Sequence, residues 1–239
     1  MVKKTVQGLM MLSALLWSTG GAQARDLFKD MQMDVFVLGG GSTLIDSHYF
    51  PGASSLYYSH FELGPKFSVG AAVPYGKYLN IETAYSYGPN NFVVTDDNEF
   101  PHKGVVYPVR VYIGSISGVF HSPATIFHLR PYAEAGVEFD RFSPTPAAVA
   151  EAYDHGFASV STAIITHNDK FGLNLGGGLD RKLTKRLTFR IDLRDHVTSS
   201  PAFGIPPIPT PDNLAVFPAK GRANNIEYTA GIIFHIGKL

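Results

Sequence analysis

The chain has 239 residues, of which 45% are hydrophobic and 17% charged, so it has the length for a single barrel or for one to two ordinary domains. Its 20 basic and 20 acidic residues give a formal charge of zero, which offers a nucleic-acid partner no electrostatic support. The absence of cysteine excludes disulfides, thiolate zinc sites and a cysteine nucleophile.

The first two dozen residues have the pattern of an export signal. Lys3 and Lys4 provide the positive start, residues 9–17 form a short apolar core, and Ala22-Gln23-Ala24 is a small-x-small cleavage site. The apolar core is shorter than the roughly 20 residues of a membrane-spanning helix, which is the argument against the alternative of an N-terminal anchor. We predict a signal peptide over 1–24, cleaved after about Ala24, and one domain over 25–239.

The rest of the chain contains eight segments with the period-two alternation of strands. The clearest is 187–194, in which apolar residues alternate with Thr188, Arg190, Asp192 and Arg194. A helical period near 3.6 would scatter these charges around the helix axis. The expected strands lie, in chain order, near 34–44, 61–71, 79–87, 109–113, 129–139, 171–180, 187–194 and 228–236. Prolines at 65, 108 and 131 leave three strand boundaries open, and 147–153 looks weakly helical.

Short and long connections alternate between these strands. The short ones lie near 74–77, 121–126 and 182–186, whereas the others run over about 45–58, 88–106, 142–169 and 198–224. A membrane barrel has short periplasmic turns and longer outer loops, whereas a soluble sandwich has no reason to sort its loops by end. The alternation predicts an all-β, eight-stranded antiparallel up-and-down transmembrane β-barrel with four longer extracellular loops.

The two faces of the expected strands differ in polarity. One face carries Phe, Leu, Ile, Val and Tyr, and the other carries glycine, asparagine and charged residues, as a barrel with lipid outside and a polar lumen requires. We assign the following charged or titratable side chains to the lumen: Glu62, Lys66, Glu82, Arg110, Arg130, Glu134, Glu138, Asp180, Arg190, Asp192, Arg194, Glu227 and His235. Tyrosines near strand ends are candidates for interfacial girdles, the alternative being ordinary sheet aromatics: Tyr75, Tyr78, Tyr85, Tyr87, Tyr107 and Tyr228.

The last strand carries a more specific pattern. Thr229-x-Gly231-x-x-Phe234-x-Ile236 resembles the signal of bacterial outer-membrane proteins that the barrel-assembly machinery reads. Members of that class usually end on an aromatic residue, whereas this chain continues through Gly237-Lys238-Leu239. The stretches 64–67 and 81–88 are similar to the second and third strands of OmpA-like outer-membrane β-barrel proteins. This resemblance implies the eight-stranded barrel fold and an outer-membrane location, but it does not supply a function.

The assigned lumen has two interpretations. An eight-stranded barrel is just wide enough for side chains to fill, so oppositely charged residues are expected to pair as a polar core, which argues against a wide pore. The alternative is an ion path or a proton site along the same residues.

Candidate chemistry elsewhere is weak. Histidines and aspartates in or beside the expected loops lack ligand spacing: His48, His60, His102, His155, His167, His196, Asp96, Asp97, Asp154 and Asp169. His196 with Asp195, Ser199 and Ser200 has the residue types of an acyl-transfer site, but triads are normally assembled from separated elements. Gly39-Gly40-Gly41 lacks the lysine and the strand–helix context of a phosphate loop. We expect no catalytic residue, no metal and no cofactor.

These observations predict a monomeric, non-enzymatic barrel in the bacterial outer membrane, with a structural or surface-interaction role. Its expected partners are outer-membrane lipids and, during biogenesis, the barrel-assembly machinery. Two alternatives stay open: a lipid-modifying or proteolytic barrel enzyme with a site at the outer rim, and a narrow small-solute channel.

Overall fold

The computed structural model describes residues 32–45, 48–51, 56–96, 105–154, 166–201, 203 and 222–237. The predicted signal peptide over 1–24 lies outside them. The described elements, in chain order, are β1 (Met33–Ile45), β2 (His48–Pro51), β3 (Leu56–Phe61), β4 (Gly64–Tyr75), β5 (Leu79–Asp96), β6 (Val105–His121), β7 (Arg130–Pro144), α3 (Pro146–Asp154), β8 (Asn168–Lys182), β9 (Leu187–Ser199) and β10 (Arg222–Ile236).

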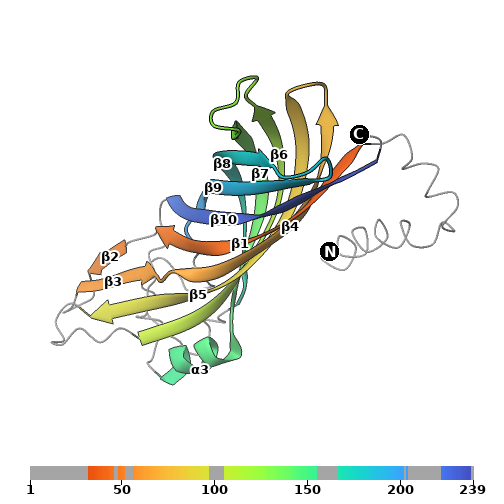
Figure 1. The fold of residues 1–239 in the computed structure, drawn as a ribbon. Coiled ribbons are helices and arrows are strands. Elements are labelled where there is room, and N and C mark those ends of the chain that lie inside the picture. Colours follow the sequence, from red (N-terminus) through yellow and green to blue (C-terminus); the bar gives the residue numbers. More distant parts are fainter. Residues whose placement is uncertain are drawn as a thin grey trace, which may run out of the picture.

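Eight of these strands close into a barrel (Figure 1). Hydrogen-bonded neighbours follow the order β5-β4-β1-β10-β9-β8-β7-β6, and β5 pairs with β6 to complete the ring. Every pairing is antiparallel, and the last strand pairs with the first along the whole length of β1, from Met33 opposite Ile236 to Ile45 opposite Asn224. Closure leaves none of these eight strands as the edge of a sheet. The predicted eight-stranded up-and-down antiparallel barrel is confirmed.

The connections differ in detail from those expected. The first long connection contains the β2–β3 hairpin, and β3 continues the ladder of β5 beyond the part that pairs with β4. The second connection is shorter than expected, because β5 and β6 extend to Asp96 and from Val105. The weakly helical segment of the third connection is α3. We call the end that carries the β2–β3 hairpin and α3 the loop end (Figure 1).

The opposite end, which we call the turn end, carries three short connections, 76–78, 122–129 and 183–186. Gly76 has a φ of 78°, in the left-handed region that favours glycine. Phe127 and His128 also have positive φ, and they form a two-residue turn closed by hydrogen bonds between Ile126 and Leu129 in both directions. In the third turn, the Thr184 hydroxyl accepts hydrogen bonds from the backbone N–H groups of Arg186 and Leu187.

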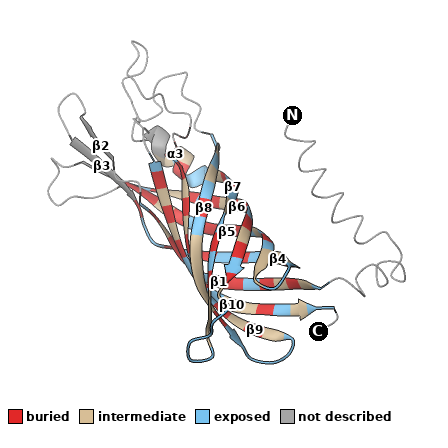
Figure 2. Cartoon of the chain, turned by 90° about the horizontal axis from the view of Figure 1, so that it is seen from above, coloured by how far each residue is buried: buried red, intermediate tan, exposed pale blue. Residues whose placement is uncertain are grey.

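Burial along the strands is the reverse of that in a soluble barrel. Buried and exposed residues alternate along the eight barrel strands (Figure 2). The exposed positions are often large and apolar, as with Val69, Leu173 and Leu193, each at least half exposed. The buried positions include lysine, arginine and glutamate. No helix among the described residues is long and apolar enough to cross a membrane.

The lumen is not polar throughout. Near the loop end it contains an apolar cluster, which we call the loop-end cluster, whose buried members come from five barrel strands, β3, α3 and the fourth long connection. They are Leu44, Phe61, Phe92, Tyr107, Val109, Val111, Ile113, Phe142, Ala148, Phe203 and Ala223. Ala148 of α3 and Phe203 of the fourth long connection belong to this cluster, so the connections contribute side chains to the interior at the loop end.

The prolines and glycines of the strands occupy positions that the barrel can use. Pro65 and Pro131 are the second residues of β4 and β7, and Pro108 lies near the start of β6, so each stands near a strand end. Gly178 of β8 leaves room for a lumen side chain, because a Cβ there would lie 2.6 Å from the Tyr132 hydroxyl and even closer to the Ile191 carbonyl oxygen.

Candidate functional site

The lumen is where the structure gathers most of the charged residues singled out from the sequence. Arg130 and His235 are half-buried near the turn end. Nine of the thirteen are buried inside the barrel: Lys66, Glu82, Glu134, Glu138, Asp180, Arg190, Asp192, Arg194 and Glu227. They come from six strands, so their meeting depends on barrel closure.

Two of the assignments were wrong. Arg110 is exposed on the outside of β6, because at this height the lumen is lined by Val109 and Val111 of the loop-end cluster. Glu62 is also exposed, in the two-residue break between β3 and β4, where its side chain accepts a hydrogen bond from Asn91. Both errors have the same cause. Near the loop end the residues that face the lumen are apolar, so the polar residues next to them in the sequence face outward.

Arg190 of β9 organises the lumen nearest the turn end. Its guanidinium donates two hydrogen bonds to Asp180 (2.9 and 3.0 Å) and one to Glu82 (2.8 Å). The guanidinium carbon also lies 4.4 Å from the centre of the Tyr132 ring, within cation–π range. His121 contacts the same Asp180 carboxylate at 3.0 Å. One cation therefore joins four strands of the barrel.

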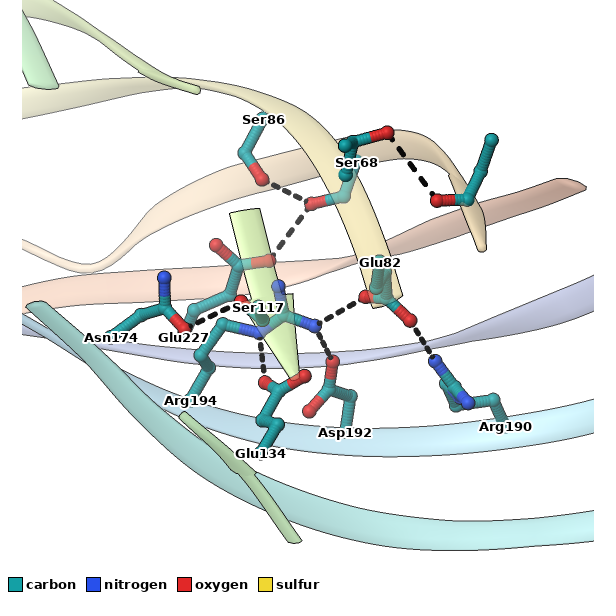
Figure 3. Close-up of polar contacts among 12 residues, drawn as sticks. Ser68, Glu82, Ser86, Ser117, Glu134, Asn174, Arg190, Asp192, Arg194 and Glu227 are labelled. Atoms are coloured by element: carbon teal, nitrogen blue, oxygen red, sulfur yellow. Dashed lines mark hydrogen bonds and ion pairs between the residues drawn. The ribbon is translucent and has the colours of Figure 1, made fainter. Parts of the chain in front are cut away.

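Arg194, two inward-facing positions beyond Arg190 on β9, joins three carboxylates (Figure 3). It pairs with Glu82 (3.3 Å) across the lumen, with Asp192 (2.5 Å) on its own strand, and with Glu134 of β7. All four side chains are at most 4% exposed. Glu82 thus receives hydrogen bonds from both arginines, and removal of either arginine would leave a buried carboxylate underpaired.

A second group of charges lies on the loop-end side of Arg194. The His196 imidazole stands between two glutamates, with Nδ1 2.5 Å from Glu138 and Nε2 3.2 Å from Glu227. Lys66 pairs with Glu227 at 3.3 Å, and the Ser68 hydroxyl donates to the same carboxylate at 2.8 Å. We call the residues around Arg190, Arg194 and His196 the central network.

His196, expected from the sequence among the histidines in or beside the loops, is a buried lumen residue. A signal was available, because His196 continues the alternation of Arg190, Asp192 and Arg194 along the same face of β9. This placement excludes an acyl-transfer site made of His196 and Asp195. His196 points inward, whereas Asp195 points outward and accepts a hydrogen bond from Asn224. Ser199 is exposed and Ser200 is buried.

A third histidine lies at the turn end of the lumen. His235 of β10 contacts Asp34 through Nδ1 (2.6 Å) and the Thr188 hydroxyl through Nε2 (2.8 Å). The order of hydroxyl, imidazole and carboxylate is that of an acyl-transfer site. The threonine, however, belongs to a regular strand rather than to the sharp turn that exposes a nucleophile in hydrolases. The contacts join β9, β10 and β1 beside the seam between the first and last strands.

Charge in the lumen is unbalanced. Among the described residues the buried carboxylates are Asp34, Glu82, Glu134, Glu138, Asp140, Asp180, Asp192 and Glu227, against Lys66, Arg190 and Arg194. Eight acidic side chains against three permanent cations leave a formal excess of five acids before the histidines are counted. Both oxygens of Asp140 are buried without a hydrogen-bond partner. Such an interior favours protons or small cations over anions.

The candidate metal ligands are not brought together. Within the described ranges, no group of three or more His, Asp or Glu side chains is arranged to hold a metal ion. His167 lies 3.9 Å from Asp169, while His102, His155 and Asp97 lie outside the described residues. Nothing is described of the side chains of His48, His60, Asp96 and Asp154.

An ion pair on the outer surface marks the end of the exposed apolar residues. Phe139 of β7 and Phe171 of β8 are the last outward-facing apolar residues of their strands before Arg141 and Asp169. Arg141 donates hydrogen bonds to both Asp169 oxygens, at 2.7 and 2.8 Å. These hydrogen bonds lower the pKa of the Asp169 carboxyl below its ordinary value.

The four residues of the predicted assembly signal lie on β10. Thr229 faces the lumen and is buried, Gly231 follows it on the same face, and Phe234 and Ile236 face outward, 46% and 42% exposed.

Of the tyrosines proposed for girdles, Tyr75, Tyr85 and Tyr228 are exposed, and Tyr78 and Tyr87 are half-buried. Tyr107 was wrongly included, because it lies in the loop-end cluster.

Comparison with known proteins supports the fold alone. A scan against protein-family models and a search of curated proteins found no match. Among solved structures, the chain is similar to the outer membrane protein OprG from Pseudomonas aeruginosa, with a TM-score of 0.53, 12% identity, and coverage of 88% of this chain and 98% of that one. It is also similar to Neisserial surface protein A, with a TM-score of 0.51, 11% identity, and coverage of 84% and 96%. The resemblance to eight-stranded outer-membrane barrels is thus confirmed at the level of fold, over most of both chains.

Proposed function

We propose that this protein is an integral barrel of the bacterial outer membrane with a structural or surface-interaction role, and that its lumen is closed by side chains. The observation that carries the proposal is the inverted polarity of the barrel. Lys66, Arg190 and Arg194 are at most 3% exposed, whereas large apolar residues cover the outside. In water this arrangement would be unstable, but in a bilayer both faces are satisfied.

The exposed apolar residues supply the lipid-facing surface. They occur on all eight barrel strands: Val37, Phe67, Val69, Ile81, Tyr85, Ile116, Val137, Phe139, Leu173, Leu175, Ile191, Leu193, Tyr228 and Phe234. Burial of apolar surface is worth about 25 cal/mol per Å², so transfer of such a belt from water into lipid is strongly favourable. The same belt would cause aggregation of a soluble protein.

The interior supports a plug rather than a wide pore. The loop-end cluster fills one mouth with apolar side chains, and the central network crosses the lumen from β5 to β9 through Glu82, Arg190 and Arg194. An eight-stranded barrel has little further room. A role in envelope integrity, or in surface binding through the longer connections, fits such a closed scaffold better than bulk diffusion.

A second candidate function, a narrow path for protons or small cations, is favoured by one observation. The described lumen holds eight buried carboxylates but three lysine or arginine side chains, and both Asp140 oxygens lack a protein partner. This excess of negative charge would exclude anions and attract cations.

Planar bilayers containing the purified protein test both candidates. The closed scaffold predicts no reproducible conductance steps in 1 M KCl, whereas a narrow path predicts small steps with strong cation selectivity. Arg194→Met serves as the control, because it removes the cation that pairs with three carboxylates in the lumen and should either open the lumen or destabilise the barrel. Large, weakly selective steps from the unmodified protein would contradict a filled interior.

Location, processing and biogenesis are part of the proposal. Export would require removal of residues 1–24, and insertion by the barrel-assembly machinery would use Thr229, Gly231, Phe234 and Ile236 of β10. Expressed in a bacterium, the protein should be found in the outer-membrane fraction, as a monomer whose gel migration changes on heating. Phe234→Ala should reduce its yield in that fraction, whereas Phe171→Ala, an equally outward-facing change on another strand, should not. A protein freely soluble without detergent would contradict the proposal.

A further inference from the structure

The two ends of the barrel differ in surface charge. At the turn end, six basic side chains are exposed or half-exposed: Lys77, Arg130, Arg181, Lys182, Lys185 and Arg186. The acids of this end, Asp34 and Asp180, are buried and already paired with His235, His121 and Arg190. Within the described part of the turn end, no acidic side chain is therefore free to neutralise the six cations.

The loop end lacks this bias. Its basic side chains that are not buried are Arg110, Arg141, Lys170 and Arg222, and its acidic ones are Glu62, Glu151, Asp169 and Asp195. Four cations stand against four acids in the described part, and Arg141 and Asp169 pair directly. The positive charge of the turn end is thus a local property and does not follow from the composition of the chain.

The β8–β9 turn concentrates the charge. Arg181, Lys182, Lys185 and Arg186 fall within six residues, all four side chains are exposed, and none forms a hydrogen bond or ion pair with another described side chain. The backbone of the turn is fixed by the Thr184 hydroxyl and by hydrogen bonds from the N–H groups of Leu183 and Thr184 to the Leu187 carbonyl. Four unpaired cations therefore project from an ordered turn at the edge of the apolar belt.

Each turn at this end also exposes a large apolar side chain. Tyr75 is 73% exposed, Phe127 is 90% exposed and Leu183 is 51% exposed. Phe127 is held outward by a backbone with positive φ, a conformation unfavourable for an aromatic residue. Apolar tips beside cations are typical of surfaces that lie at the level of lipid headgroups.

We propose that the turn end is a binding surface for the headgroups of anionic phospholipids, an inference that rests on the proposed membrane location. The cations of the three turns would bind lipid phosphates, and Tyr75, Phe127 and Leu183 would enter the acyl-chain border. Because short turns mark the periplasmic end of such barrels, the leaflet involved is the inner one. Arg181 of β8, opposite Phe189 in the register, stands where the apolar belt gives way to headgroups.

The test uses two matched double variants with the same change in charge. Lys185→Gln/Arg186→Gln removes two cations from the turn end, and Arg110→Gln/Arg222→Gln removes two from the loop end. Each protein, folded in detergent, is titrated with phosphatidylglycerol or phosphatidylcholine, and bound lipid is counted by native mass spectrometry. The unmodified protein should prefer phosphatidylglycerol, and the turn-end variant should lose about fivefold in affinity per cation removed, while the loop-end variant should be unchanged.

Three results would overturn the proposal. The unmodified protein could bind both lipids equally, both double variants could weaken binding equally, or peptidoglycan fragments could bind to the turn end where phosphatidylglycerol does not. Insertion into phosphatidylcholine vesicles, followed by heat-modifiable migration, separates this proposal from the previous one. If the protein inserts but shows no lipid preference, only the headgroup-binding proposal is contradicted. If it fails to insert, the proposed membrane location is contradicted as well.

Discussion

The loop-end half and the central half of the lumen are filled in opposite ways. Toward the loop end the interior is a dry cluster built from Phe92, Tyr107 and Phe142, closed by Phe203 and Ala148. In the centre it is a network of two arginines, a lysine, two histidines and carboxylates with almost no exposed surface. The comparison shows that residues of the strands alone build the central network, in which ions pair across the lumen. The loop-end cluster also requires side chains from α3 and the fourth long connection.

The largest effect is expected from the central half. Arg194→Met leaves Glu82, Glu134 and Asp192 buried without their common guanidinium. Breaking a buried ion network on one side typically costs about 3–5 kcal/mol. Urea unfolding of the barrel in lipid vesicles should show this loss, whereas Arg110→Met, on the exposed outer face, should change the free energy of unfolding by less than about 0.5 kcal/mol. Equal losses in the two variants would contradict a buried network at Arg194.

The loop-end half should give a somewhat smaller loss of a different kind. Phe142→Ala removes a fully buried ring and should cost about 3 kcal/mol, because the cavity is only partly filled by relaxation. The same urea titration, repeated at low and high salt, measures it. The loss should not depend on salt, since no charge is involved, and a strong salt dependence would show that the cluster is open to ions.

A glycine beneath the central network sharpens the comparison further. Gly178→Ala places a Cβ against the Tyr132 hydroxyl and the Ile191 carbonyl, and it should cost about 1–3 kcal/mol by displacing the ring that packs on Arg190. Gly114→Ala is the control, because a Cβ there meets nothing within 4 Å. Thermal unfolding in one lipid compares the two, and similar midpoints would mean that Tyr132 has room to move.

The smallest effect should come from the pair outside the lumen. Hydrogen bonds from Arg141 lower the pKa of Asp169 in the folded protein, so the pair stabilises the fold above the unfolded pKa of about 4 and loses this effect as the pH falls. Asp169→Asn should therefore cost less than about 1 kcal/mol at pH 7, and this cost should shrink as the pH falls below about 4. Urea titrations of both proteins at a series of pH values measure the difference, and a cost that did not fall with pH would exclude the ion pair as its origin.

Strand alternation was sufficient to predict the barrel, but the faces of individual strands needed local information. On β9 all six alternate residues from Thr188 to Thr198 are charged or polar, so the sequence indicated which face of this strand is inward. On β6 the alternation is equally regular, yet Val109 and Val111 point inward and Arg110 outward. A period of two fixes which residues share a face, but only neighbouring strands decide which face is inside.

The alternating pattern of eight segments, and their sorted connections, determined by themselves that this chain closes into an up-and-down antiparallel barrel, because both signals are local along the chain. The tertiary structure alone decided which charges meet. Glu82 contacts Arg190 and Arg194, more than one hundred residues away, across a lumen that exists only after β1 and β10 have joined. It also decided that one half of the lumen is apolar, since the side chains that cover it come from connections without a periodic signal.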